Sequence, residues 1–242
     1  MIVAESIGFA ATHSITEILG ELPDYEVSHG SQHFELKHPV GHPPQSPEDF
    51  VASMVAAEAA GRTPVAVHTL ISPQLLKPAC DAAGVDYWLL VREPLAQIES
   101  CYAWIARSVL NGQAGHFQQV LQQSLGELTQ RKIQANLPNC LFFFACHHVL
   151  SFNFIALGMG ASPQKMETLM SDEAQFRTAF SVPEDVAIPH FDDASVHSAS
   201  HRAAADLGAL AEPERETIRD TYTLNLGGKT YRLTDMIKLL GY

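Results

Sequence analysis

The chain has 242 residues, of which 46% are hydrophobic and 17% charged, a composition typical of a globular protein and not of a disordered one. Its formal net charge is −12, with 15 Lys and Arg against 27 Asp and Glu, which argues against nucleic acid and anionic membrane surfaces as partners. The sequence shows no apolar run of about 20 residues that would cross a membrane, and its start, MIVAES, lacks the basic segment of a signal peptide.

Five β-rich apolar runs along the chain are predicted to be strands. They are Ile2–Glu5, Tyr25–Ser28, Val65–Thr69, Tyr87–Val91 and Leu141–Ala145. The last three runs are almost continuously apolar, as expected for parallel strands that are covered on both faces.

Helix signals stand between these runs. The S-x-x-E pattern from Ser14 to Glu17 predicts a capping box, with apolar residues following at helical spacing. Proline at the first helical position, and in two cases glycine beyond the end, predicts further helices. Their expected ranges are 46–61, 72–84 and 94–110, and a long helix is expected near His116 to Asn136.

The pattern weakens beyond residue 150. We expect short helices near 162–180 and 201–222, a long surface loop over 181–200, and a hairpin around Gly227-Gly228 followed by a short helix. Strands that alternate with helices predict one α/β domain over residues 1–242. Its architecture is expected to be three-layered, with a central, mostly parallel sheet of about five strands flanked by helices.

The first candidate site is the loop between the first strand and the capping-box helix. A helix that begins directly after a strand presents backbone N–H groups and a positive dipole end, which suit phosphate or sulfate. Gly8 allows a tight turn, and Thr12, His13 and Ser14 offer side-chain donors. The segment has no GK[ST] and is not a Walker A loop, and an ordinary strand-to-helix connection explains it as well.

The second candidate site runs from Arg92 to Ser100. Arg92 stands at the carboxyl end of a buried strand, where open α/β sheets bind ligands. Ser100 falls in the second turn of the next helix, with its side chain inclined toward the helix start. Guanidinium and hydroxyl can therefore meet on one phosphate, although an ion-paired surface Arg and an ordinary helix Ser fit the spacing equally well.

These residues resemble a known family. The segment from Pro64 to Trp104 is similar to the central segment of sulfotransferases that use 3′-phosphoadenosine 5′-phosphosulfate (PAPS), with Arg92, Pro94, Ser100 and Tyr102 matching its R-x-P pattern and the Ser eight residues after the Arg. The loop SIGFAATHSITEIL resembles the 5′-phosphosulfate loop in position. The specific likeness covers about a quarter of the chain.

The resemblance implies a single sulfotransferase-like domain with a P-loop-like fold and PAPS as cofactor. It implies that Arg92 and Ser100 hold the 3′-phosphate. It also implies that the 5′-phosphosulfate lies on a loop formed by Gly8, Ala11, Thr12, His13 and Ser14. The loop departs from the family pattern, because the usual basic residue and second glycine are missing.

His68 lies near the end of the predicted Val65–Thr69 strand, where the family often has a histidine as general base. We therefore expect His68 to be catalytic, although a histidine on a strand is also a common structural residue. A base needs suitable geometry as well as a suitable side chain, so the sequence leaves both roles open.

Other chemistry-bearing groups are weaker candidates. Cys140, Cys146, His147 and His148 match no zinc ligand spacing, and the apolar residues between them predict core rather than metal. With Cys80 and Cys101, the cysteines form no CxxC pair and are expected to be buried thiols in a reducing cytoplasm. A polar set in the 181–201 region fits an acceptor pocket or a solvated loop: His190, Asp192, Asp193, His197 and His201. Lys229 fits a cofactor phosphate or a turn position.

The leading hypothesis is a cytoplasmic sulfotransferase that acts on a hydroxyl or amine of a small-molecule acceptor. One alternative is a catalytically degenerate member of the fold that binds a nucleotide or anion, which the altered loop favours. A second alternative is a small-molecule kinase, against which the missing Walker lysine argues. No metal is expected, and homo-oligomerisation is left open.

Overall fold

The computed structural model describes residues 1–30, 46–113, 118–191 and 207–242. The chain forms two units, each built from two separate stretches. Unit 1 comprises Met1–Arg92 and Asn153–Ala199, and unit 2 comprises Glu93–Phe152 and Ser200–Tyr242. The expectation of one domain over residues 1–242 stays a prediction.

Unit 1 contains a five-stranded sheet in the order β2-β3-β1-β4-β5, in which every pairing is parallel. Its strands are β1 (Ile2–Glu5), β2 (Tyr25–His29), β3 (Thr63–Val67), β4 (Asp86–Val91) and β5 (Ser162–Lys165). The first four were predicted, with ends that differ by two residues at most. The expected α/β architecture, a parallel sheet flanked by helices, is confirmed.

The predicted strand Leu141–Ala145 is wrong. These residues belong to α6 (Leu137–Gly158), a helix in which every residue from Cys140 to Cys146 is buried. A short apolar run that is buried on all sides does not distinguish a strand from a helix by its periodicity. The fifth strand is instead β5, whose sequence is SPQK. Three of its four residues are exposed, and an edge position tolerates Pro163, so no apolar pattern marks it.

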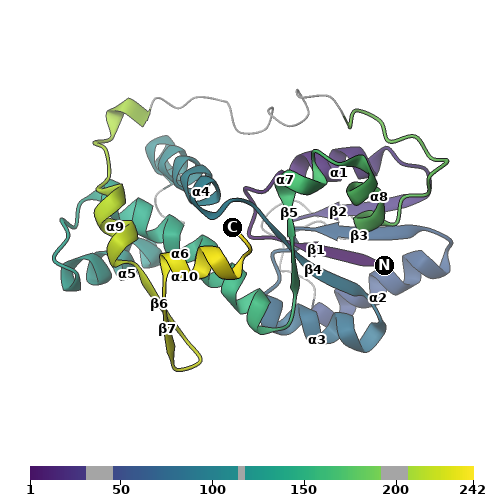
Figure 1. Cartoon of the computed structure of the whole chain (residues 1–242), viewed down its shortest axis with the longest axis horizontal. Helices are drawn as coiled ribbons and strands as arrows, with labels where there is room; N and C mark the ends of the chain where they lie inside the picture. Colours follow the sequence, from purple (N-terminus) through teal and green to yellow (C-terminus); the bar gives the residue numbers. More distant parts are fainter. Residues whose placement is uncertain (31–45, 114–117, 192–206) are drawn as a thin grey trace. The chain divides into compact units, whose positions relative to one another are not determined.

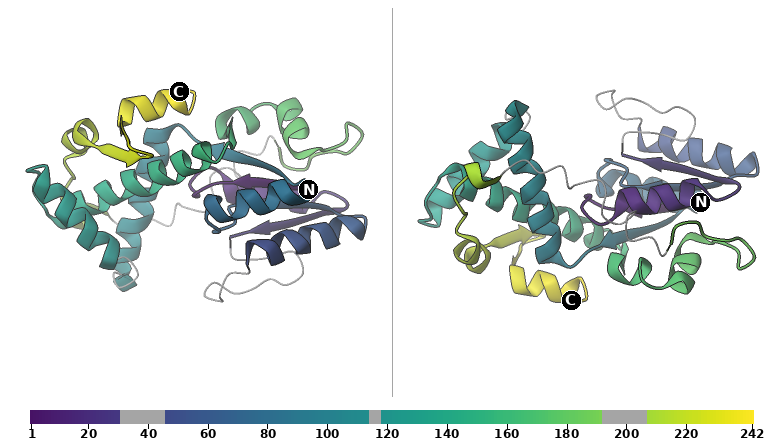
Figure 2. Two further views of the ribbon diagram at one scale, coloured as in Figure 1. Left: turned by 90° about the horizontal axis from the view of Figure 1, so that it is seen from below. Right: turned by 90° about the horizontal axis from the view of Figure 1, so that it is seen from above.

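Helices cover both faces of the sheet in unit 1 (Figures 1 and 2). One face carries α1 (Thr12–Gly20), α7 (Met166–Leu169) and α8 (Glu173–Phe180), and the other carries α2 (Pro47–Ala59) and α3 (Pro73–Ala83). The start of α2 agrees with the sequence signal, since Ser46 accepts a hydrogen bond from the Asp49 N–H at 3.0 Å. Gly84 ends α3 in the left-handed conformation, as predicted.

The core of unit 1 forms where α1 and α8 pack on the sheet. Ile15, Ile18 and Leu19 come from one face of α1 and are fully buried. Phe180 of α8 meets Trp88 of β4 with ring centroids 5.4 Å apart. This packing fixes the start of α1 against the carboxyl edge of the sheet.

The predicted capping box at Ser14 is wrong. The helix begins two residues earlier, at Thr12, and the cap position is Ala11, which has no side-chain hydrogen bond to offer. Ser14 is buried within the first turn. The chain enters the helix early because Gly8, Phe9 and Ala11 all have positive φ and turn it sharply after β1.

Unit 2 is mainly helical. Its elements are α4 (Pro94–Ser108), a π-helical turn (Val109–Gln113), α5 (Gln118–Gln130), α6 as far as Phe152, a 3₁₀ turn (Leu207–Ala209), α9 (Arg215–Thr221), β6 (Thr223–Leu226), β7 (Lys229–Arg232) and α10 (Leu233–Leu239). The predicted hairpin at Gly227-Gly228 and the short final helix are confirmed. The Glu99 carboxylate ties α4 to α9 by accepting from Arg215 at 3.0 Å and from Arg219 at 2.5 Å.

Among the described residues, α6 is the one helix long and apolar enough to cross a membrane by length and composition. The expectation that the chain has no apolar run of this length is therefore wrong. Of the most apolar 18-residue stretch of α6, 67% is buried inside the protein. A core helix of a soluble protein meets the same criteria, and this burial accounts for the composition of α6 without a membrane.

Candidate functional site

The candidate site lies at the carboxyl edge of the sheet in unit 1, where β1 stands between β3 and β4. The loops after β1 and β3 contain four non-glycine residues with positive φ: Phe9 (62°), Ala11 (52°), His68 (56°) and Leu70 (64°). Such backbone conformations cost free energy and gather at ligand-binding and catalytic sites. Their clustering at one sheet edge makes this edge the candidate site.

His68 is held in a defined protonation form at the end of β3. Its Nδ1 lies 2.6 Å from the backbone carbonyl oxygen of Ser6, which can only accept a hydrogen bond. Burial lowers the pKa of His68, opposed by this hydrogen bond and aided by the charge of His13. A neutral ring with Nδ1 protonated leaves a lone pair on Nε2, so His68 can accept a proton there.

Gly8 lies against the His68 ring. A Cβ atom added at Gly8 would stand 3.5 Å from Cε1 of the imidazole, and its φ of 93° also favours glycine. The turn is closed locally, because the Ser6 hydroxyl accepts from the Gly8 N–H at 3.1 Å. The structure thus brings together two of the residues that the sequence proposed, Gly8 and His68.

His29, at the end of β2, is a member of the site that the sequence analysis missed. Its ring lies near two other imidazoles in tilted arrangements, with centroid distances of 4.1 Å to His13 and 5.4 Å to His68. Burial, followed by the charges of His13 and His68, lowers the pKa of His29 to about 3. His29 is therefore neutral at ordinary pH. Its position directly at the carboxyl end of a parallel strand is the signal that would have found it.

Thr12 connects this histidine cluster to the first turn of α1. Its hydroxyl lies 3.1 Å from Nε2 of His29, and the side chain is buried. His13 is exposed next to it, while Ser14 points into the protein interior and is only 6% exposed. Thr12, His13 and Ser14 all lie in the first turn of α1, and their role in binding an anion stays a prediction.

Glu5 is a second residue that sequence reasoning missed. It is fully buried at the end of β1, and one carboxylate oxygen accepts from the N–H groups of Ser6 and Thr69, each at 3.0 Å. The other oxygen forms a short hydrogen bond with the Thr69 hydroxyl. Burial raises the pKa of Glu5 to about 7, against the hydrogen bonds from Thr69 and Ser6, which lower it. Glu5 therefore braces the loops that carry the site.

Arg92 follows β4 directly and reaches the loop after β1. Its Nη1 donates to the carbonyl oxygen of Phe9 at 3.2 Å, and the residue is half-buried. In the described loops after β1, β3 and β4, Arg92 is the one arginine or lysine. Ser100 lies half-buried in the second turn of α4, in the other unit. The expected meeting of Arg92 and Ser100 on one phosphate stays a prediction.

Three kinds of donor at this edge are of the type that binds phosphate or sulfate. They are the start of α1, whose cap residue Ala11 has no side-chain hydrogen bond to its first turn, the Thr12 hydroxyl and the Arg92 guanidinium. No basic side chain lies in the segment from Ser6 to Ala11. This segment itself therefore offers an anion backbone N–H groups and no cation.

Among the described residues, none of the other sequence candidates takes part in the hydrogen bonds described above for His68, Thr12 and Arg92. Cys140 and Cys146 are buried free thiols on α6, and Cys80 and Cys101 are buried and free as well. No group of three or more metal-ligating side chains is found in the described part of the chain. Lys229 is exposed on the hairpin of unit 2, and His190 lies 3.6 Å from Glu21. Asp192, Asp193, His197 and His201 fall outside the described residues, as does His116.

No protein-family model and no curated protein sequence match this chain. Among solved structures, it is similar to a sulfotransferase domain from the curacin biosynthetic pathway, with 13% sequence identity and a TM-score of 0.42. The match covers 99% of this chain and 94% of the other. A likeness at this TM-score does not bear on function, which must be argued from the site itself.

Proposed function

We propose that the chain is a sulfotransferase that moves a sulfuryl group from PAPS to a hydroxyl or amine of a small acceptor. The observation that carries the proposal is the His68 imidazole, which is fixed by Ser6 with a lone pair on Nε2, beside the anion-suited loop after β1. A base next to an anion site is the arrangement that group transfer to a hydroxyl requires.

The residues proposed to hold the cofactor are the backbone around Gly8 and Ala11, the first turn of α1 with Thr12 and His13, and Arg92. The α1 start and Thr12 suit the phosphosulfate, and a guanidinium suits a phosphate because it offers a fork of donors. When bound, the cofactor would supply an electrophilic sulfur for transfer to the acceptor oxygen or nitrogen, with the nucleotide phosphate as leaving group.

His68 takes the acceptor's proton at Nε2 as the new bond to sulfur forms. Its Nδ1–H stays on the Ser6 carbonyl, which stabilises the imidazolium that results. The Thr12 hydroxyl and the N–H groups of the first turn of α1 stabilise the charge on the departing phosphate oxygen. His29 is held neutral at ordinary pH and keeps the Thr12 side chain in place.

A second candidate is a protein of this fold that binds a nucleotide or anion without catalysis. Phe9, Ala10 and Ala11 stand where the resembled family has a basic residue and a glycine, which favours this alternative. No observation at the site favours a small-molecule kinase.

The experiment combines binding and turnover. 3′-Phosphoadenosine 5′-phosphate should raise the melting temperature more than adenosine 5′-phosphate does, because a ligand at 100 times its dissociation constant adds about 2.7 kcal/mol. Release of 3′-phosphoadenosine 5′-phosphate from PAPS is then followed with a panel of phenols, alcohols and amines. Binding with no turnover across the panel supports the second candidate, and absence of binding overturns both.

A further inference from the structure

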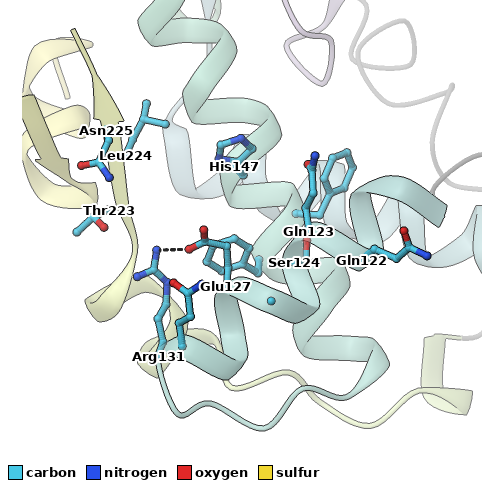
Figure 3. A pocket seen from close by; sticks show the side chains of 13 residues that line it. Gln122, Gln123, Ser124, Glu127, Arg131, His147, Thr223, Leu224 and Asn225 are labelled. Carbon is cyan, nitrogen blue, oxygen red and sulfur yellow. Dashed lines mark hydrogen bonds and ion pairs between the residues drawn. The ribbon is translucent and has the colours of Figure 1, made fainter. Parts of the chain in front are cut away.

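Unit 2 contains a pocket of about 440 Å³ that the proposed transfer reaction does not use. Its walls come from α5, α6 and the strand β6, all within this unit (Figure 3). Thr223 and Asn225 of β6 line one side and Gln123 of α5 lines the opposite side. The volume is in the range of sites that bind small ligands or single side chains of a partner.

The edge of β6 that is not paired with β7 presents backbone polar groups. The hairpin turns at Gly227 and Gly228, both with positive φ, so Leu226 and Lys229 form the hydrogen-bonded pair next to the turn. Hydrogen-bonded pairs alternate with non-hydrogen-bonded ones. Asn225 and Thr223 therefore direct their N–H and C=O groups away from β7.

The pairing of Asn225 with Thr230 supports this register. Their side chains are hydrogen-bonded, with the Thr230 hydroxyl 2.6 Å from Oδ1 of Asn225. Side chains come closer together in non-hydrogen-bonded pairs. Since Asn225 and Thr223 line the pocket, their outward backbone groups lie at its wall.

The two edges of this hairpin differ in how they are protected. β7 has the sequence KTYR and carries Lys229 and Arg232, and cations of this kind oppose pairing with another strand. β6 has the sequence TLNL, with no charge and no proline. Its edge therefore lacks the charged residues and prolines that oppose the addition of another strand.

Gly126 lies in the interior of α5 on the pocket wall. Glycine there costs about 1 kcal/mol of helix stability relative to alanine. A Cβ added at Gly126 would meet nothing within 4 Å, so packing within the protein does not require the glycine. It leaves room at the wall opposite β6.

The charges of the pocket cancel. Glu127 and Arg131 form an ion pair at 2.8 Å, and the Arg131 guanidinium lies 5.4 Å from the centre of the Phe143 ring. Burial lowers the pKa of His147, while the charge of Glu127 raises it. The net lowering favours the neutral ring. Nε of Arg131 is buried and bonds no atom of the described residues. A neutral ligand that brings hydrogen-bond acceptors suits this lining.

We propose that the pocket binds an extended, uncharged peptide segment, which adds as a strand to the free edge of β6 and places one apolar side chain against Phe143 and Leu224. Backbone hydrogen bonds to Thr223 and Asn225 provide affinity, and the cavity provides selectivity for alternate side chains. The proposal uses none of the residues of the sulfuryl-transfer site and is independent of it.

The probe is a pentapeptide of alternating threonine and valine, acetylated and amidated so that it carries no charge. Hydrogen exchange followed by NMR should show added protection of the Thr223 and Asn225 amides when the peptide is present, with those of Lys229–Arg232 unchanged. A second peptide, N-methylated at alternate positions on one edge, lacks the donors for pairing and should not bind. Equal binding of both peptides, or binding without protection in β6, overturns the proposal.

Matched proline variants test the edge in the protein. Asn225→Pro removes an N–H that points outward, and Thr230→Pro removes the corresponding outward N–H on β7. Both variants lose the same Asn225–Thr230 side-chain bond. Asn225→Pro should weaken peptide binding roughly 2–10-fold, the effect of one hydrogen bond, while Thr230→Pro leaves it unchanged. Equal weakening by both contradicts strand addition at β6.

The pocket is tested separately at Gly126. Gly126→Ala should keep peptide binding and raise the melting temperature, because alanine favours the helix. Gly126→Leu should also fold, but its side chain enters the pocket and should abolish binding. Binding that survives Gly126→Leu would exclude this cavity as the site.

Discussion

The Nδ1 atom of His68 lies 2.6 Å from the carbonyl oxygen of Ser6, so the ends of the neighbouring strands β3 and β1 are joined by a side-chain hydrogen bond. A carbonyl oxygen cannot donate, and the contact therefore selects the imidazole form with Nδ1 protonated. All proton exchange with an acceptor is confined to Nε2.

The pH dependence of sulfuryl transfer follows from this environment. Burial lowers the pKa of His68 below its ordinary value of 6.5, so the base stays unprotonated as the pH falls through 6.5. We expect kcat/KM to stay constant from pH 8 to below 6.5 and to fall only at lower pH. A fall centred at or above pH 6.5 would exclude His68 as the group that titrates.

Replacing His68 with Asn should lower the transfer rate about 10²–10⁴-fold, because the variant has no base. The fold should persist, since asparagine tolerates the positive φ of 56° at this position. His190→Asn is the matched control: His190 also has a φ of 56° and is exposed elsewhere in unit 1. Equal rates in the two variants would show that His68 has no catalytic role.

Glu5→Gln should change how stability depends on pH. The pKa of Glu5 rises from 4.5 to about 7 on folding, so the folded state binds more protons between these values. The contribution of Glu5 to stability is therefore greatest below pH 4.5 and is lost as the pH rises through 7. The variant should lack this fall and be more stable at pH 8 by roughly 3 kcal/mol, as measured by urea unfolding. Glu17→Gln, on exposed α1 surface, is the control and should keep the wild-type slope.

Ala11→Gly should stabilise the protein by about 1 kcal/mol, because Ala11 adopts a left-handed conformation that glycine adopts without a side-chain clash. Gly8→Ala should destabilise it, since its φ of 93° is a conformation that alanine rarely adopts. The melting temperatures of the two variants, compared with that of the unchanged protein, show whether stability rises in Ala11→Gly and falls in Gly8→Ala. A loss of stability in Ala11→Gly would mean that the strain at Ala11 is offset by an interaction of its methyl group.

Arg92→Ala should abolish the preference for 3′-phosphoadenosine 5′-phosphate over adenosine 5′-phosphate in melting shifts. A hydrogen bond to a charged group contributes about 1.5–3 kcal/mol, which corresponds to a roughly 10–150-fold loss of affinity. Arg92→Lys should recover only part of it, because an ammonium group lacks the planar fork. If Arg92→Ala instead unfolds the protein, its bond to Phe9 is structural.

Much of unit 1 could be predicted from local signals. Pro47 and Gly84 mark helix ends through backbone conformations that only these residues favour, and β3 and β4 are apolar because both faces are covered. The strand β5 could not be predicted, because an edge strand with three exposed residues needs no apolar side chains. The residues 141–145 were misassigned because full burial removes the periodicity that separates helix from strand.

The site was predicted only in part. Gly8, His68 and Arg92 stood at strand ends and could be proposed from that position alone. Glu5 and His29 lie at strand ends as well, but a carboxylate inside a strand and an isolated histidine have no pattern of their own. Their roles depend on partners far along the chain, Thr69 and Thr12, which only the register of the sheet brings near.

The interleaving of the two units constrains how the chain can be synthesised and divided. β4 ends at Val91 but its partner β5 begins at Ser162, after the whole first stretch of unit 2 has been made. During synthesis the edge of β4 that pairs with β5 therefore stays unpaired until residues 162–165 have been made, after the helices of the first stretch of unit 2. No single cut of the chain releases either unit whole. A gene for unit 1 alone would have to join Arg92 directly to Asn153.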